Sequence, residues 1–182
     1  MSLPTRPLTV TINGARQGPI DVPEGMMMID VLHEMLDLTG SRLGCGMGIC
    51  HACVVIWDRD DKTSEEVPTC VTGADFFNDK RIRTIEGIAQ KNDKDEIELS
   101  QVQQAFLDYF SFQCGYCTPG FVNAATVLLE RLKRSPVRRA DVEATVAAAL
   151  DNHLCRCTGY VRYYQAVRDV ILATPGLTQD GA

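Results

Sequence analysis

The stretch Gly44-Cys45-Gly46-Met47-Gly48-Ile49-Cys50-His51-Ala52-Cys53 constrains the fold more than any other part of the sequence. Three of its residues are cysteines, and a fourth cysteine, Cys70, follows after a gap. Thiols this close in sequence can surround one compact centre only if the backbone curves tightly. The alternating glycines permit the positive φ angles that such a curve requires, and they let backbone N–H groups approach the sulfur atoms. The stretch therefore predicts a metal-binding loop.

The spacing of these cysteines indicates which centre the loop holds. The pattern C-x4-C-x2-C with one remote cysteine is typical of plant-type 2Fe-2S sites, which assigns Cys45, Cys50, Cys53 and Cys70 as ligands. Zinc and disulfides are the alternatives, but zinc loops place their local cysteines in matched pairs. A Rieske centre would need two histidines, so we expect His51 to be a solvated loop side chain, with a hydrogen-bond donor beside the cluster as the alternative.

The segments around this loop predict an α+β unit. Residues 8–22 alternate apolar and polar side chains about Asn13-Gly14, which predicts a hairpin. Apolar residues at helical spacing, from Met28 to Leu36, predict a helix that ends near Gly40. We expect a small mixed sheet crossed by this helix, with further strands at residues 54–57, 66–71 and 81–85.

The character of the sequence changes after Gly87. Polar residues at 92–95 form a solvated connection, and apolar residues beyond it recur at helical spacing. We therefore expect two domains, at residues 1–87 and 88–182. The second is expected to be a small four-helix bundle, with helices at residues 100–112, 119–134, 141–150 and 160–173.

The second half contains four further cysteines, arranged as two pairs. Cys114 and Cys117 precede one expected helix, and Cys155 and Cys157 precede another. Helix N-termini carry partial positive charge, so two such helices would bring four thiolates together around an anionic centre. From these residues alone, an iron–sulfur cluster and a zinc ion are equally compatible.

Composition and charge limit the classes of function. Hydrophobic residues at 45% and charged residues at 23% are typical of folded domains, and a net charge of −6 disfavours a nucleic-acid partner. Eight cysteines favour metal over disulfides in a reducing compartment. Residues 1–10 contain no continuous apolar core, so we expect no signal peptide or membrane span and cofactor loading in the cytoplasm. Export to the periplasm together with a partner subunit is the alternative.

These motifs resemble those of the small iron–sulfur subunit of the xanthine oxidase family of molybdenum hydroxylases. This family includes aldehyde, isoquinoline, nicotinate and carbon monoxide dehydrogenases. One departure is His51, where many relatives have glycine. The resemblance covers nearly the whole chain, and its marks are residues 44–53, 67–70, 84–87, 113–120 and 154–160.

The resemblance implies an N-terminal β-grasp ferredoxin domain, followed by a four-helix domain. It implies that Cys114, Cys117, Cys155 and Cys157 hold a second 2Fe-2S cluster. This second cluster would lie nearer the molybdopterin of a large partner subunit, with Gln113 contacting the pterin; a capping or surface glutamine is the alternative for Gln113. The first cluster would pass electrons outward to a flavin-binding or cytochrome c subunit.

The implied function is single-electron transfer during oxidation of an aldehyde or an N-heterocycle. We expect no catalytic acid, base or nucleophile in this chain, because the cofactors perform the chemistry and the catalytic site belongs to the large subunit. Two other interpretations are a free-standing ferredoxin and a ferredoxin domain fused to a structural zinc module.

Overall fold

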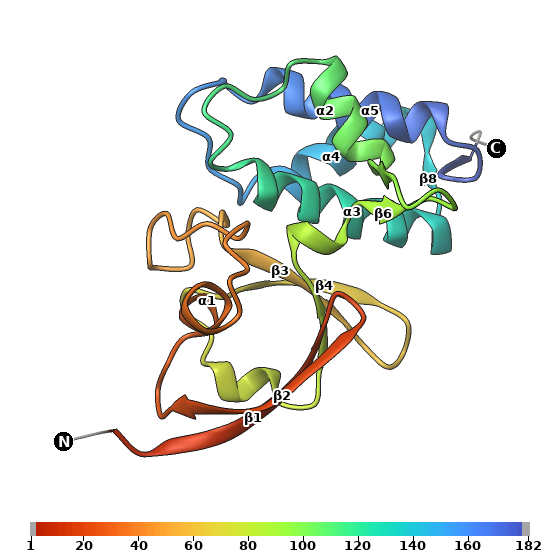
Figure 1. The fold of residues 1–182 in the computed structure, drawn as a ribbon. Coiled ribbons are helices and arrows are strands. Elements are labelled where there is room, and N and C mark those ends of the chain that lie inside the picture. Colours follow the sequence, from red (N-terminus) through yellow and green to blue (C-terminus); the bar gives the residue numbers. More distant parts are fainter. Residues whose placement is uncertain (1–2, 180–182) are drawn as a thin grey trace.

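The computed structural model describes residues 3–179, so the outermost residues of both predicted domains, 1–2 and 180–182, lie outside the described residues. A β-rich half and a helical half lie against each other (Figure 1). Helix α3 (Thr118–Arg134) runs along their boundary and contacts strands β3 (Val54–Asp58) and β4 (Ser64–Pro68). Figure 1 also shows the two cysteine-bearing regions on the same side of the molecule.

The predicted hairpin is present. Strands β1 (Thr5–Ile12) and β2 (Ala15–Pro23) pair antiparallel about a turn in which Asn13 and Gly14 have φ angles of 52° and 83°. Positive φ at both turn residues matches the right-handed twist of the strands and explains the Asn-Gly sequence. The alternating apolar residues of β1 are buried, as the period of two predicted: Leu8, Val10 and Ile12.

The hairpin belongs to a five-stranded mixed sheet with the order β2-β1-β5-β3-β4. Strand β5 (Arg81–Arg83) pairs parallel with β1 and antiparallel with β3. The expected strands at 66–71 and 81–85 are both shorter than predicted, because β4 ends at Pro68 and β5 at Arg83. Cys70 consequently lies in the turn that follows β4, where the direction of its side chain is not set by the alternating faces of a strand.

The helix expected from Met28 to near Gly40 differs from the prediction and is shorter. The chain forms a short α-helix, α1 (Met28–Asp30), that continues as a π-helical segment over Val31–Met35. Asp37, with a φ of 54°, ends the segment because this left-handed conformation cannot continue a helix. The helical spacing predicted the burial of Met28, Val31 and Leu32, whereas Met35, which shares that spacing, is 38% exposed.

The later half contains the α-helices α2 (Gln101–Asp108), α3, α4 (Val142–Leu150) and α5 (Val161–Ala173), close to the predicted ranges. A capping box between Ser100 and Gln103 starts α2. The prediction missed two short strand pairs, because two-residue strands are too short to show a period. They are β6 (Gln90–Lys91) with β7 (Ile97–Glu98), and β8 (Val137–Arg138) with β9 (Thr178–Gln179).

Strand β3 connects the two hydrophobic cores. Successive side chains of a strand point to opposite faces. Val55 accordingly packs into the sheet core, whereas Ile56 packs into the helical core with Phe121 and Tyr163. Helix α3 covers the second face, and Asn123 on that helix donates from Nδ2 to the carbonyl oxygen of Val54 at 2.8 Å. The face of the sheet that carries Ile56 is thereby buried by α3 instead of being exposed to solvent.

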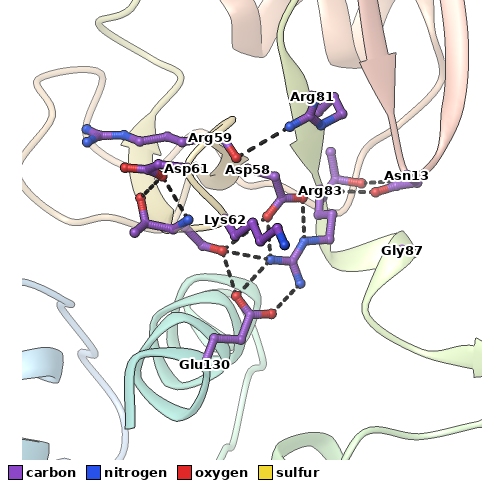
Figure 2. A network of polar contacts seen from close by, with 12 residues as sticks. Asn13, Asp58, Arg59, Asp61, Lys62, Arg81, Arg83, Gly87 and Glu130 are labelled. Atoms are coloured by element: carbon purple, nitrogen blue, oxygen red, sulfur yellow. Dashed lines mark hydrogen bonds and ion pairs between the residues drawn. The ribbon is translucent and has the colours of Figure 1, made fainter. Parts of the chain in front are cut away.

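A polar network also crosses this boundary (Figure 2). The guanidinium of Arg83 on β5 lies between Asp58 on β3 and Glu130 on α3. Ser64 on β4 donates from Oγ to Glu130 Oε2 at 2.7 Å. Three strands of the sheet and one helix of the second half are therefore joined by one partly buried ion-pair cluster.

Among residues 3–179, none of the helices combines the length and apolar character that crossing a membrane requires.

Candidate metal centres

The loop at residues 44–53 has the tight curvature that its glycines predicted. Gly46 and Gly48 have φ angles of 66° and 69°. The backbone N–H groups of Met47 and Cys50 donate to Cys45 Sγ, at 3.3 and 3.4 Å. These hydrogen bonds lower the pKa of the Cys45 thiol to about 6, with Cys50 N–H the largest cause. The loop thus favours thiolate at a position assigned as a ligand, because a metal binds the thiolate form of cysteine.

Gly44 is required by close approach of a sulfur atom. A Cβ at this position would lie 3.0 Å from Cys50 Sγ and would also meet Ala52 and Tyr116. A larger residue would therefore push the Cys50 thiol away from Cys45, whose side chain it contacts. Limited space beside the sulfur atom therefore explains the glycine at position 44, whereas backbone conformation explains Gly46 and Gly48.

The other two cysteines of the first set lie deeper. Cys53 is buried and adjoins Cys70, and the Thr69 hydroxyl donates to the Cys53 carbonyl oxygen at 2.7 Å. Burial raises the pKa of the Cys53 thiol to about 11. An isolated thiolate would be unfavourable there, so this position suits a ligand whose negative charge is balanced by bound metal.

The four cysteines of the second set come together as the sequence predicted. Cys114 and Cys157 lie with their sulfur atoms 3.4 Å apart at the surface, while Cys117 and Cys155 are neighbouring buried thiols. Cys117 directly precedes α3, and the 155–159 loop precedes α5. The arrangement is two exposed and two buried thiols, which offers four sulfur ligands around one centre.

Two hydroxyl groups adjoin the buried pair. Burial raises the pKa of Cys117 to about 12. Burial also opposes ionisation of Cys155, but the Thr158 hydroxyl at 3.0 Å and nearby N–H groups outweigh it and lower the pKa of Cys155. The Tyr163 hydroxyl lies 2.7 Å from Thr118 Oγ1 and 3.7 Å from Cys117 Sγ. The sequence carries no signal for this role of Tyr163, because the residue lies in the apolar stripe of a helix, where an aromatic side chain is typical of the core.

Cysteines of both sets line a common cavity of about 290 Å³. The backbone N–H of Leu154 donates to the carbonyl oxygen of Cys50 at 3.1 Å, and the Tyr116 hydroxyl donates to the carbonyl oxygen of Leu43 at 2.8 Å. Both contacts join the first loop to the second set. The cavity is lined by cysteines of both sets: Cys45, Cys50, Cys114, Cys117, Cys155 and Cys157.

His51 is not the solvated loop side chain that we expected. It has a φ of 56°, and its ring packs edge-on against that of His153 with centroids 5.1 Å apart. Burial, followed by the neighbouring His153, lowers the pKa of His51. The expectation failed because only the tertiary structure brings the 153 loop over the first cysteine loop. The backbone of His51 is also covered, since a Cβ at Gly120 would lie 2.3 Å from its carbonyl oxygen.

Gln113 lies at the surface beside the exposed Cys114. Around the cysteine loops, several large apolar side chains are also exposed. Such a concentration beside a metal site is typical of a surface that a partner covers. The apolar members are Leu43, Met47, Ile49, Val71, Tyr116 and Leu154.

Both halves match known protein-family models. Residues 10–75 match the 2Fe-2S iron-sulfur cluster binding domain, and residues 84–168 match the 2Fe-2S binding domain. The chain is 36% identical over 161 residues to the nicotinate dehydrogenase small FeS subunit of Eubacterium barkeri, with 88% of this chain and 92% of that subunit covered. The chain belongs to the small iron–sulfur subunits of the molybdenum hydroxylases. The match over residues 84–168 favours iron–sulfur over zinc for the second set.

Other relatives agree with this family. The nicotine 6-hydroxylase small subunit of Paenarthrobacter nicotinovorans is 36% identical over 169 residues, covering 93% of this chain and 89% of that subunit. The crystal structure of quinoline 2-oxidoreductase from Pseudomonas putida 86 contains a chain with a TM-score of 0.74 and 30% identity, covering 91% of each chain. The present chain is accordingly a small iron–sulfur subunit that serves electron transfer in an oxidoreductase complex.

Proposed function

We propose that this subunit holds two 2Fe-2S clusters and relays single electrons from a molybdopterin centre in a large partner subunit. Cys45, Cys50, Cys53 and Cys70 would hold one cluster. Cys114, Cys117, Cys155 and Cys157 would hold the other. One observation carries the proposal: Cys45 and Cys50 line one cavity together with all four cysteines of the second set, and a backbone hydrogen bond from Leu154 to Cys50 links the two loops.

The proposed architecture is a β-grasp ferredoxin domain followed by a four-helix domain, with the boundary near residue 87. The parallel pairing of β1 and β5 in a mixed sheet supports the first part. The helices α2, α3, α4 and α5 support the second. Ile88 packs into the helical core, which agrees with a boundary just before it.

The protein's own residues provide position and electrostatics for the clusters. Bound clusters would supply one-electron acceptance and donation. The N–H groups of Met47 and Cys50 stabilise negative charge at Cys45, and the Thr158 hydroxyl does so at Cys155. Such hydrogen bonds favour the more negative reduced state and raise the reduction potential.

The second cluster would lie nearer the molybdopterin. Cys114 and Cys157 are exposed, so a partner can approach that cluster closely. Gln113, exposed beside Cys114, is proposed to contact the pterin. The first cluster would deliver electrons to a flavin-binding or cytochrome c subunit across the exposed apolar side chains of Met47 and Ile49.

We propose an aldehyde or an N-heterocycle as the substrate of the complex, and the cytoplasm as the place where the clusters are loaded.

Metal analysis and spectroscopy test the ligand assignment. Two plant-type clusters predict about four irons and no zinc per chain, with two distinct paramagnetic signals after reduction. A structural zinc module would instead give zinc together with one signal. Stable copurification with a large subunit separates the proposed role from that of a free-standing ferredoxin.

The variant C114S tests the assignment of Cys114 to the second cluster. We expect it to lose the signal of the second cluster and to stop turnover of the complex, while the partner still binds substrate. The matched variant C45S should lose the other signal instead. Undiminished turnover of C114S with both signals intact would show that Cys114 is not a ligand.

A further inference from the structure

A histidine–glutamate cluster lies between the two cysteine sets. His51 comes from the first cysteine loop, Glu66 from β4, and His153 from the segment between α4 and α5. The candidate ligand atoms of these three residues all lie within 4.8 Å of one another. His153 Nε2 is 2.8 Å from Glu66 Oε2. Three segments far apart in sequence thus direct two imidazoles and one carboxylate at one point.

The polar groups of this cluster are buried and incompletely paired. The side chain of His153 is 2% exposed and that of Glu66 is 22% exposed. Among the described residues, Nδ1 of His51 and Nδ1 of His153 are buried without a partner in hydrogen-bond geometry. Unpaired buried polar atoms are unfavourable, so native structures retain few of them without a reason.

The orientation of His153 leaves one ring nitrogen for a ligand. Its Nδ1 faces Gly120, where a Cβ would lie 3.1 Å away, so α3 closes that side of the ring and this nitrogen stays unpaired whether or not an ion binds at Nε2. Its Nε2 faces Glu66 and His51. The neighbouring cavity has a volume of about 310 Å³ and is lined by all three residues, with Val127, Ala149 and Asn152 among its walls. Water can therefore reach a fourth position beside the three side chains.

We propose that His51, Glu66 and His153 bind one Zn²⁺ ion at a site separate from both cysteine sets. Two imidazoles and one carboxylate are ligands that zinc commonly takes, and three protein ligands leave a tetrahedral position for water. The two imidazoles disfavour Mg²⁺ and Ca²⁺, which prefer oxygen ligands. Zinc has no redox chemistry, so it would not divert electrons from neighbouring clusters.

The position of the ion indicates its role. His51 directly follows Cys50, and His153 lies two positions before Cys155, so the ion would fasten the two cysteine loops to each other. Glu66 would fix both to β4. Zn²⁺ with one carboxylate and two neutral imidazoles carries a net positive charge, which favours the reduced state of any cluster nearby.

The full-length protein with about four irons per chain is the material for the test. Titration with ZnCl₂ by isothermal calorimetry is expected to give one tight site per chain. Zinc-edge X-ray absorption should show nitrogen and oxygen at about 2.0–2.2 Å and no sulfur at about 2.3 Å, which excludes zinc at unloaded cysteines. The variants H51A and E66Q should each weaken binding by about tenfold or more, as loss of a ligand or its orienting group does.

Two variants serve as matched controls. E65Q removes the carboxylate of Glu65, which precedes Glu66 on β4 and pairs with Arg59. H33Q removes a histidine that contacts the Ser41 carbonyl oxygen. Both should bind zinc as the wild type does. Absence of a stoichiometric site, sulfur in the zinc shell, or wild-type affinity in H51A and E66Q would each overturn the proposal, leaving a hydrogen-bonded link between His153 and Glu66. Because measurements on the wild-type protein suffice for the first two of these outcomes, the test does not depend on the variants folding.

Discussion

The substitution E130Q tests whether the ion pair across the boundary holds the two halves together. Glu130 on α3 receives two hydrogen bonds from the Arg83 guanidinium, at 2.8 and 3.0 Å, and one from the Ser64 hydroxyl. Glutamine keeps the size of the side chain but carries an amide group. At least one N–H of the guanidinium would then face another N–H group instead of an oxygen atom.

The expected magnitude follows from the burial and the remaining partners. The side chains of Arg83 and Glu130 are 24% and 27% exposed, so the pair is neither fully buried nor solvated. Asp58 still neutralises Arg83 in the variant, which keeps the loss below the ~3–5 kcal/mol of an orphaned buried charge. Losing one charge-assisted bond should lower the free energy of unfolding by about 1–2 kcal/mol. For a chain of this size, that corresponds to about 2–8 °C in melting temperature.

Differential scanning calorimetry of the cluster-loaded protein measures this change, with E143Q as the matched control. Glu143 pairs with Arg168 at 3.4 Å, but its side chain is 79% exposed. An exposed pair contributes little, so E143Q should lower the melting temperature by no more than about 2 °C. Equal losses in E130Q and E143Q would contradict this expectation, because the partly buried pair would then contribute no more than a solvated one.

The pH dependence of E130Q has a definite sign. Burial opposes ionisation of Glu130, but the hydrogen bonds from Arg83 and Ser64 outweigh it and hold the pKa of this carboxyl below its ordinary value. A lowered folded-state pKa stabilises the protein above the unfolded pKa of about 4.3, and this contribution is lost as the pH falls through the folded value. The stability difference between wild type and E130Q should therefore be constant from about pH 8 to 6 and shrink below about pH 4. A difference that grows on acidification would contradict this assignment.

Two further variants address the cysteine loops. G120A places a Cβ 2.3 Å from the His51 carbonyl oxygen, so we expect a loss of about 1–3 kcal/mol from overpacking and a changed paramagnetic signal of the first cluster; a wild-type melting curve would exclude this tight contact. Y163F removes the hydroxyl near Cys117 Sγ. A hydrogen bond of about 0.5–1.5 kcal/mol, at about 60 mV per 1.4 kcal/mol for one electron, predicts a potential of the second cluster about 20–60 mV lower. A spectroscopic redox titration giving an unchanged potential would show that this hydroxyl does not donate to the sulfur.

The features that could be predicted from the sequence alone are those that depend on neighbours along the chain. The cysteine spacing and glycines of residues 44–53 predicted a tightly curved loop, and the Asn13-Gly14 turn predicted the hairpin. Helical spacing located α3 and α5 within a residue or so, because a helix buries side chains at a fixed period. The same local information predicted that both cysteine pairs of the second half precede helices.

Features that depend on residues distant in sequence arise only in the folded chain. Arg83 and Glu130 are 47 positions apart, and Glu66 and His153 are 87 positions apart, so no periodicity relates them. His51 appeared solvated in sequence because the segment that covers it lies about a hundred residues later, and its burial arises only when α3 packs on β3. A local pattern specifies the conformation of a segment, whereas charge pairing and burial are set by which segments meet in space.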